Sequence, residues 1–111
     1  MRYITVPKTI DAMKKLDCDN NLDGDLDELI LDDTDFHKIF STGIFNDINL
    51  ALNILIDDYE DEKIIGKEKL KRTKIIIENY FIKNGKMNII EKFLILIESA
   101  IKYDTGIYFY F

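Results

Sequence analysis

The side chains that most often perform catalysis are scarce in this chain. Its 111 residues include one histidine, His37, one cysteine, Cys18, and no tryptophan. His37 has no serine or cysteine near it at a spacing used in nucleophilic catalysis, and no cluster of histidine and cysteine has the spacing of a zinc site. The sequence also lacks a glycine-rich loop that would cradle a phosphate. We therefore expect neither enzymatic activity nor a cofactor.

Oxygen ligands, in contrast, are plentiful, and one stretch partly matches the calcium-binding loop of an EF-hand. Residues 19–27 place Asp and Asn side chains at alternate positions and a glycine at the sharp turn. Position 12 of that loop, where the motif needs a bidentate glutamate, is Ile30. Starting the frame at Asp17 puts Glu28 there but loses the glycine. Weak EF-hand-like calcium binding thus stands as an alternative to a solvated acidic loop.

The strongest physical signal is the uneven placement of charge. The net charge is −6, from 21 acidic and 15 basic residues. Residues 17–62 contain fifteen acidic residues and one basic residue, Lys38, a net charge of −14, whereas the rest of the chain carries +8. An acidic surface speeds encounter with a cationic partner and repels nucleic acid and anionic membranes. The expected partner is a basic protein, with no direct binding to nucleic acid or to a membrane.

The carboxylates of this segment form two clusters, which supply the candidate partner-binding residues. The candidate residues from the first cluster are Asp23, Asp25, Asp27, Glu28, Asp32, Asp33 and Asp35. The candidate residues from the second cluster are Asp57, Asp58 and Glu60. The alternative interpretation is a pair of solvated loops whose charge is balanced by the basic run at residues 63–74.

Hydrophobic periodicity indicates which elements carry these clusters. Residues 2–6 are short and β-branched and predict a strand, and Pro7 suits the first turn of a helix over residues 8–16. The polar stretch 17–24 predicts a loop. Residues 26–31 fit either one face of a helix or a buried strand, and the pattern leaves both open.

Two further helices are expected in the middle of the chain. The first is short, contains Phe36, Ile39 and Phe40, and has Asp33 or Thr34 as its cap. The second follows Gly43 and is predicted to extend to Tyr59, because apolar residues recur at steps of three and four. Its stripe consists of Phe45, Ile48, Leu52, Leu55, Ile56 and Tyr59.

The carboxyl-terminal third predicts two long helices and a strand. A helix over residues 67–84 ends at Asn84 and Gly85, which tolerate the left-handed conformation. Asn88 and Glu91 have the spacing of a capping box that opens a helix over residues 88–103. Residues 107–111 alternate at period two, and burying each aromatic ring would contribute roughly 1.5–3 kcal/mol. We expect this segment to pair with residues 2–6.

These elements predict a single domain covering residues 1–111. Its fold class is α+β and predominantly helical, with four to five helices and a small sheet formed by the N-terminal and C-terminal strands. The lone Cys18 cannot form a disulfide within the chain, and neither a signal peptide nor an apolar run of about 20 residues is present. A cytoplasmic location is therefore expected.

The segment from Ala100 to Phe111 contains a helix end, a Thr-Gly turn and a strand of aromatic residues. It resembles the closing stretch of small bacterial immunity proteins of contact-dependent growth inhibition systems. The resemblance implies a protein without catalytic activity that binds the carboxyl-terminal domain of a delivered toxin and covers its active site. Many such toxins are nucleases, including tRNases. The family has no fixed binding residues to transfer, so the candidate residues above come from charge placement alone.

Two other interpretations belong to different functional classes. One is an acidic interaction module that mimics nucleic acid, which predicts carboxylates spaced along an elongated face. The other is the calcium-binding module described above. The immunity interpretation predicts instead a stable one-to-one complex, salt-sensitive association and a toxin gene directly upstream.

Overall fold

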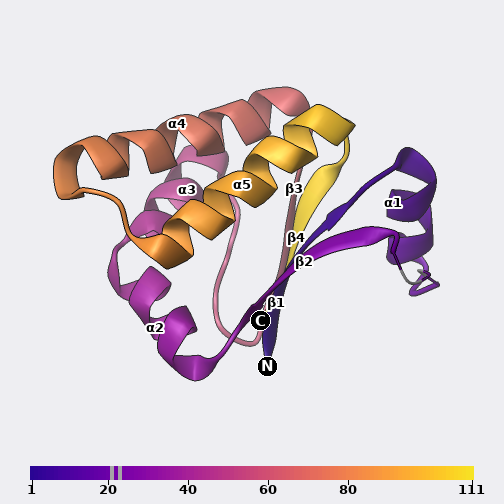
Figure 1. Ribbon diagram of the computed structural model, residues 1–111, viewed down its shortest axis with the longest axis horizontal. Coiled ribbons are helices and arrows are strands. Elements are labelled where there is room, and N and C mark those ends of the chain that lie inside the picture. Colours follow the sequence, from indigo (N-terminus) through magenta and orange to yellow (C-terminus); the bar gives the residue numbers. More distant parts are fainter. Residues whose placement is uncertain (21, 23) are drawn as a thin grey trace.

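A computed structural model describes residues 1–20, 22 and 24–111, and within this part of the chain it shows five helices and one four-stranded sheet (Figure 1). The elements are β1 (Arg2–Pro7), α1 (Ile10–Asp17), β2 (Leu26–Leu31), α2 (Asp33–Ser41), α3 (Ile44–Leu52), β3 (Asp61–Ile65), α4 (Lys67–Asn84), α5 (Asn88–Tyr103) and β4 (Gly106–Tyr110). Helices α2 to α5 lie on one side of the sheet and α1 lies on the other (Figure 1). The predicted α+β, predominantly helical class is confirmed.

The sheet is antiparallel and has the strand order β2-β1-β4-β3. Its two central strands come from the two ends of the described chain, with Tyr3 opposite Tyr110 and Ile4 opposite Phe109. The predicted pairing of the terminal strands is therefore confirmed. Residues 26–31 form a strand that pairs along all of β1, which settles the choice between helix and strand.

The strand β3 was not expected from the sequence. Its five residues, Asp61–Ile65, lie on the edge of the sheet, where Ile64 is the one buried side chain of the strand. With a single inward-facing apolar residue, it lacks the alternation that identifies a strand. The predicted sheet of two strands thus gains a strand on each side.

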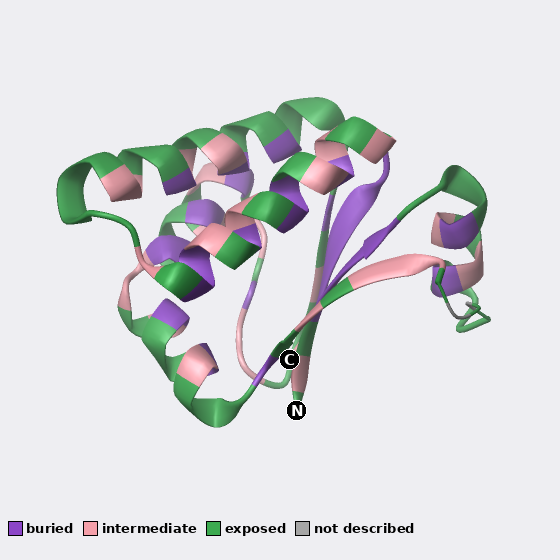
Figure 2. Ribbon diagram, viewed as in Figure 1, coloured by how far each residue is buried: buried purple, intermediate pink, exposed green. Residues whose placement is uncertain are grey.

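The core fills the space between the sheet and α5. Strand residues Ile4 and Phe109 and the α5 residue Phe93 are fully buried. Buried segments, drawn in purple, lie on the central strands and along α5 (Figure 2). The rings of Phe45, Phe93 and Phe109 meet edge to face, with centroids 5.8 to 6.0 Å apart. Such contacts between aromatic rings add to the stabilisation from area burial. None of the described helices combines the length and the apolar character needed to cross a bilayer.

Helix α3 is shorter than predicted. It ends at Leu52, and Asn53 adopts the left-handed conformation with φ 56°. The side chain of Asn49 then holds the backbone of Ile56, donating to its carbonyl oxygen at 3.0 Å and accepting from its amide at 2.7 Å. Ile56 reaches the core from this loop. Its spacing from the apolar residues of α3 is therefore the same as in a continuing helix, although the helix has ended. Leu55 and Tyr59, which belong to the predicted stripe, are instead 53% and 89% exposed.

The starts of α1 and α2 also differ from prediction. Pro7 is the last residue of β1, and α1 is capped by Thr9, whose hydroxyl oxygen accepts from the amide of Ala12 at 3.0 Å. Helix α2 is capped by Asp32 instead of Asp33 or Thr34, because its carboxylate accepts from the amide of Asp35 at 2.7 Å. In each case the capping residue is the one that leaves the strand or turn in an extended conformation.

Helix α4 has the predicted bounds, and α5 covers the predicted segment with a different cap. Helix α4 ends at Asn84, and Gly85 follows with φ 78°. Helix α5 begins at Asn88, but Asn88 lies inside the first turn and Met87 occupies the cap position, so the predicted capping box is absent. Met87 packs against the core. The helix thus begins one residue earlier than a cap at Asn88 would place it.

The buried hydroxyl of Thr105 joins the turn after α5 to β1. Its oxygen donates to the carbonyl of Pro7 at 2.7 Å. We expect Thr105→Val to lower the free energy of unfolding by about 1–3 kcal/mol, because the Pro7 carbonyl would lose its buried partner. The exposed Thr34 provides the control, and Thr34→Val should change stability by less than about 0.5 kcal/mol. Equal effects in a denaturant titration would contradict this role of Thr105.

Candidate protein-binding surface

Arg2 connects the two acidic clusters of the sequence. It begins β1 at the end of the sheet where both termini lie (Figure 1). Its Nε and Nη2 atoms each donate to a carboxylate oxygen of Asp58 at 3.0 Å, and its Nη1 donates to Asp33 at 2.7 Å. The guanidinium carbon lies 4.0 Å from the ring centroid of Phe36. One side chain therefore binds a member of each cluster.

This arrangement is ordered and electrostatically coupled. The Arg2 side chain is only 13% exposed, and a planar guanidinium suits two-point binding of a carboxylate. Its hydrogen bonds hold the pKa of the Asp58 carboxyl below its usual range. The same hydrogen bonds, to Asp58 and then Asp33, raise the pKa of the Arg2 guanidinium. Arg2 carries one positive charge and contacts two carboxylates. It therefore does not neutralise the other acidic side chains of the two clusters.

Two of the predicted residues, Asp33 and Asp58, contact this arginine, and four more lie within two residues of them along the chain; we call the six the acidic end. They are Asp32, Asp33, Asp35, Asp57, Asp58 and Glu60. The first three surround the start of α2, where carboxylates also interact favourably with the helix dipole. The last three lie on the loop between α3 and β3, which reaches the same end of the sheet (Figure 1). The fold thus joins two clusters that are separate in the sequence.

The remaining candidate residues are placed elsewhere. Asp27 accepts a hydrogen bond from the Tyr103 hydroxyl at 3.3 Å and lies 3.7 Å from the Lys8 ammonium. Asp25 precedes β2 and Glu28 lies within it, whereas Asp23 lies outside the described residues. At about 3.4 Å per residue, β2 separates Asp27 from Asp32 by about 17 Å. The first sequence cluster is therefore divided between two ends of the sheet.

The basic run of the sequence lies mainly on α4. Of its side chains, Lys74 pairs with Glu98 of α5 at 3.4 Å, and Lys63 of β3 lies 3.9 Å from Asp17. Among the ion pairs between described residues, none joins α4 to the acidic end. Positive charge does border the acidic end on one side, where Lys38 and Lys92 line a hollow with Asp35. The two signs also meet where Lys8 pairs with Asp27 and Lys63 with Asp17, so the fold separates the basic side chains of α4, and not all basic residues, from the acidic end.

The partial EF-hand match lacks the expected helical frame. Asn21 and Asp23, two of its ligand positions, lie outside the described residues. The last five positions of the frame that starts at Asp19, residues 26–30, lie in the strand β2, where an EF-hand begins its second helix. Across residues 1–20, 22 and 24–111, no three His, Cys, Asp or Glu side chains are grouped as a metal site requires.

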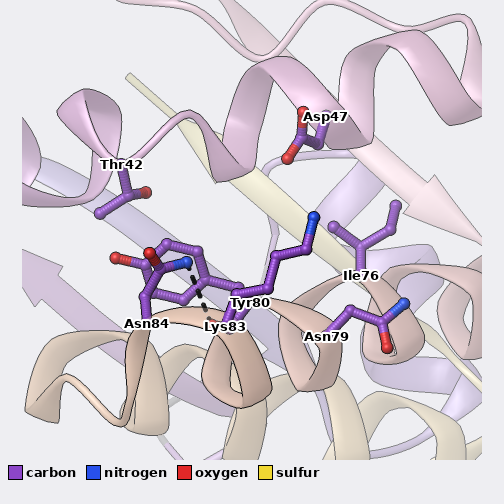
Figure 3. A pocket seen from close by; sticks show the side chains of 7 residues that line it. All are labelled: Thr42, Asp47, Ile76, Asn79, Tyr80, Lys83 and Asn84. Carbon is purple, nitrogen blue, oxygen red and sulfur yellow. Dashed lines mark hydrogen bonds between the residues drawn. The ribbon is translucent and has the colours of Figure 1, made fainter.

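A hollow of about 400 Å³ lies between α4 and the α2–α3 corner (Figure 3). It is lined by Thr42, Asp47, Ile76, Asn79, Tyr80, Lys83 and Asn84. The Lys83 amine extends toward Asp47 across the opening, and Asn84 donates to the backbone carbonyl of Tyr80 at 3.2 Å (Figure 3). Most of its polar groups are on exposed side chains, so the hollow has little preorganisation for a small ligand.

Comparisons with protein-family models, with curated proteins and with solved structures found no match. The case for a function therefore depends on this chain's own surface.

Sequence reasoning missed Arg2, although its position contained a signal. In a strand, alternate residues share one face, so Arg2 continues the row formed by Ile4 and Val6 on the side of the helices. That placement directs its side chain to the start of α2 and to the loop before β3. The partner carboxylates themselves depend on tertiary packing, which charge counting along the sequence does not include.

Removing the arginine should loosen the acidic end. In an Arg2→Met variant, we expect faster amide hydrogen exchange in residues 57–60, because the loop loses its two-point contact with β1. The low pKa of Asp58 makes this contact stabilising above the ordinary carboxyl range, and the stabilisation is lost as pH falls through the lowered pKa. Stability should thus fall less steeply on acidification in the variant than in the parent. Lys14→Met, on α1, is the matched control, and an equal change there would contradict the assignment.

Proposed function

We propose that this chain is an immunity protein that binds and neutralises a cognate bacterial toxin domain. The toxin domain is a basic nuclease, of which a tRNase is one example, and the acidic end covers its active-site cleft. The proposal is carried by the convergence of the two acidic clusters on Arg2. It is also supported by the resemblance of residues 100–111 to the closing stretch of immunity proteins. The protein acts in the cytoplasm and uses no cofactor.

The chemistry of a nuclease explains why an acidic end suits this task. A nuclease needs a cationic groove to hold its phosphate-rich substrate. Carboxylates that present a comparable density of negative charge compete for that groove and accelerate the encounter between the two proteins. Because Arg2 already orders Asp33 and Asp58, less conformational entropy is lost on binding.

Nucleic-acid mimicry is the second candidate, and one observation favours it. Asp25, Asp27 and Glu28 extend the carboxylates along β2, away from the acidic end. A mimic would use both groups, since it copies the regular charge of a nucleic-acid backbone. An immunity protein that enters a cleft would depend chiefly on the acidic end.

The proposal predicts which charges control association. The probe is the carboxyl-terminal domain of the protein encoded directly upstream of this chain. In an Asp35→Lys/Glu60→Lys variant, the association rate should fall at least about tenfold at low salt and depend less on salt, because electrostatic steering is lost. Stopped-flow mixing measures the rates, and protection of RNA from the probe domain measures neutralisation. These two positions leave the contacts of Arg2 intact.

The matched control reverses two carboxylates on α4. Glu68→Lys/Glu78→Lys makes the same change in net charge far from the acidic end and should leave the association rate nearly unchanged. Equal slowing in both variants would indicate a general charge effect and overturn the assigned surface. If Asp25→Lys/Glu28→Lys slows association as much as the acidic-end variant, mimicry is favoured. Failure of the parent protein to bind the probe domain would overturn the immunity function itself.

A further inference from the structure

The face of the sheet opposite α2 to α5 is only partly covered. Helix α1 lies beside the ends of β1 and β2 that are distant from the termini, and no described helix covers the other end (Figure 1). At that uncovered end the register places Tyr3 opposite Ile30 on one side and opposite Tyr110 on the other. These side chains from three neighbouring strands form what we call the open face. Tyr3 is 36% exposed and Ile30 is 52% exposed.

The open face has the features of an interface centre. The rings of Tyr108 and Tyr110 stack with an interplanar angle of 16° and centroids 6.3 Å apart. Beside them lies a hollow of about 300 Å³ that these rings line together with Asp17, Asp19, Asp61, Glu62 and Lys63. The Lys63 ammonium lies 5.8 Å from the centroid of the buried Tyr108 ring and 3.9 Å from Asp17, so a cation of this chain already occupies the Tyr108 side. Tyrosine is enriched at the centres of protein interfaces, because its ring supplies large contact area at low entropic cost. The hollow provides a place into which a partner side chain can fit.

Carboxylates outnumber the one lysine, Lys63, around this aromatic centre. The pKa of Tyr110 is raised to about 12, first by burial and then by four nearby carboxylates. These carboxylates belong to Asp61, Asp19, Asp17 and Glu28. They come from β3, from the end of α1 and the loop after it, and from β2, so they border the open face on several sides. An apolar centre with a charged rim is the common arrangement of an interaction surface.

The open face is also continuous with the acidic end. Arg2 precedes Tyr3, and Tyr110 pairs with Asp61, which follows Glu60. Because successive residues of a strand point to opposite faces, β1 presents Arg2 on the side of the helices and Tyr3 on the open side. The acidic end and the open face therefore meet at the same edge of the molecule.

We propose that the open face is a docking surface for the cationic surface of a partner protein, whose arginine or lysine side chains lie on Tyr3 and Tyr110 and reach the surrounding carboxylates. Charge complementarity selects this occupant. A cationic side chain gains both a cation–π contact with the rings and ion pairs with the rim, while its aliphatic stem covers Ile30. A second copy of this chain that docked through its own open face would place carboxylates against carboxylates, which is unfavourable. The proposal rests on the proposed function, because the toxin domain is the cationic partner.

The apolar contacts of the open face should slow dissociation of the complex with the partner protein. In Ile30→Thr and Tyr3→Thr variants, which keep residues suited to a strand, the complex with the upstream-encoded domain should dissociate about tenfold faster with little change in association rate. Ile82→Ala is the matched control, because Ile82 is 82% exposed on α4, and it should leave both rates unchanged. Thermal unfolding of each variant identifies any loss of folding. Ile30 lies on an edge strand, so its variant remains informative if Tyr3→Thr unfolds.

A second measurement does not depend on the toxin. An arginine-rich peptide that contains leucine is titrated into the isotope-labelled protein, and amide shifts are followed by nuclear magnetic resonance. Shifts at Tyr3, Ile30 and Tyr110 that weaken in Ile30→Thr would support the docking surface. Shifts confined to the acidic end, or a dimer of the free protein that Ile30→Thr disrupts, would overturn it.

The outcomes separate the two proposals. If the parent binds the toxin domain and the open-face variants dissociate at the parent rate, the docking surface is wrong and the proposed function stands. If the parent does not bind that domain, the proposed function fails, and the peptide titration alone decides whether the open face binds cationic chains.

Discussion

The pairing of β1 with β4 is the interaction on which the rest of the structure depends. It places the two ends of the described chain side by side at the centre of the sheet, and both edge strands pair with them. Helix α5 packs across the inner face of these strands through Phe93, whose ring meets those of Phe45 and Phe109. Because the central strands hold both the core and the edges, their register also determines which side chains reach each face.

That register divides the chemistry of β1 between two surfaces. Ile4 and Val6 face the helices and are fully buried, and Arg2 continues their row to the rim of the core. There it stacks on Phe36 and satisfies two carboxylates, so a charge at the margin of an apolar layer has partners. An unpaired arginine at such a position would be costly, since desolvation penalises a charge without partners. The acidic side chains around it are consequently part of the architecture as well as a candidate binding surface.

Elements with strong periodicity were predictable from the sequence, and elements determined by their neighbours were not. Helices α4 and α5 and the pairing of the terminal strands followed from apolar spacing. The strand β3 did not, because an edge strand with one buried residue, Ile64, lacks a recognisable alternation. The end of α3 was hidden because Ile56 returns to the core from a loop held by Asn49. In the candidate site, the sequence identified the acidic segments, but the sheet decided that Asp33 and Asp58 meet while Asp27 lies elsewhere.

The central position of β4 also has a consequence for biosynthesis. Strand β1 emerges from the ribosome about a hundred residues before its partner does, and at about 5–20 residues per second this interval lasts about 5–20 seconds. During that time β1 can pair with β2, but its other edge is open and the inner face of the sheet has no α5 to cover it. Closure of the sheet is therefore a late step of high contact order, and such steps are slow compared with helix formation. A nascent chain of this protein presents one unpaired edge of β1 until β4 has left the ribosome.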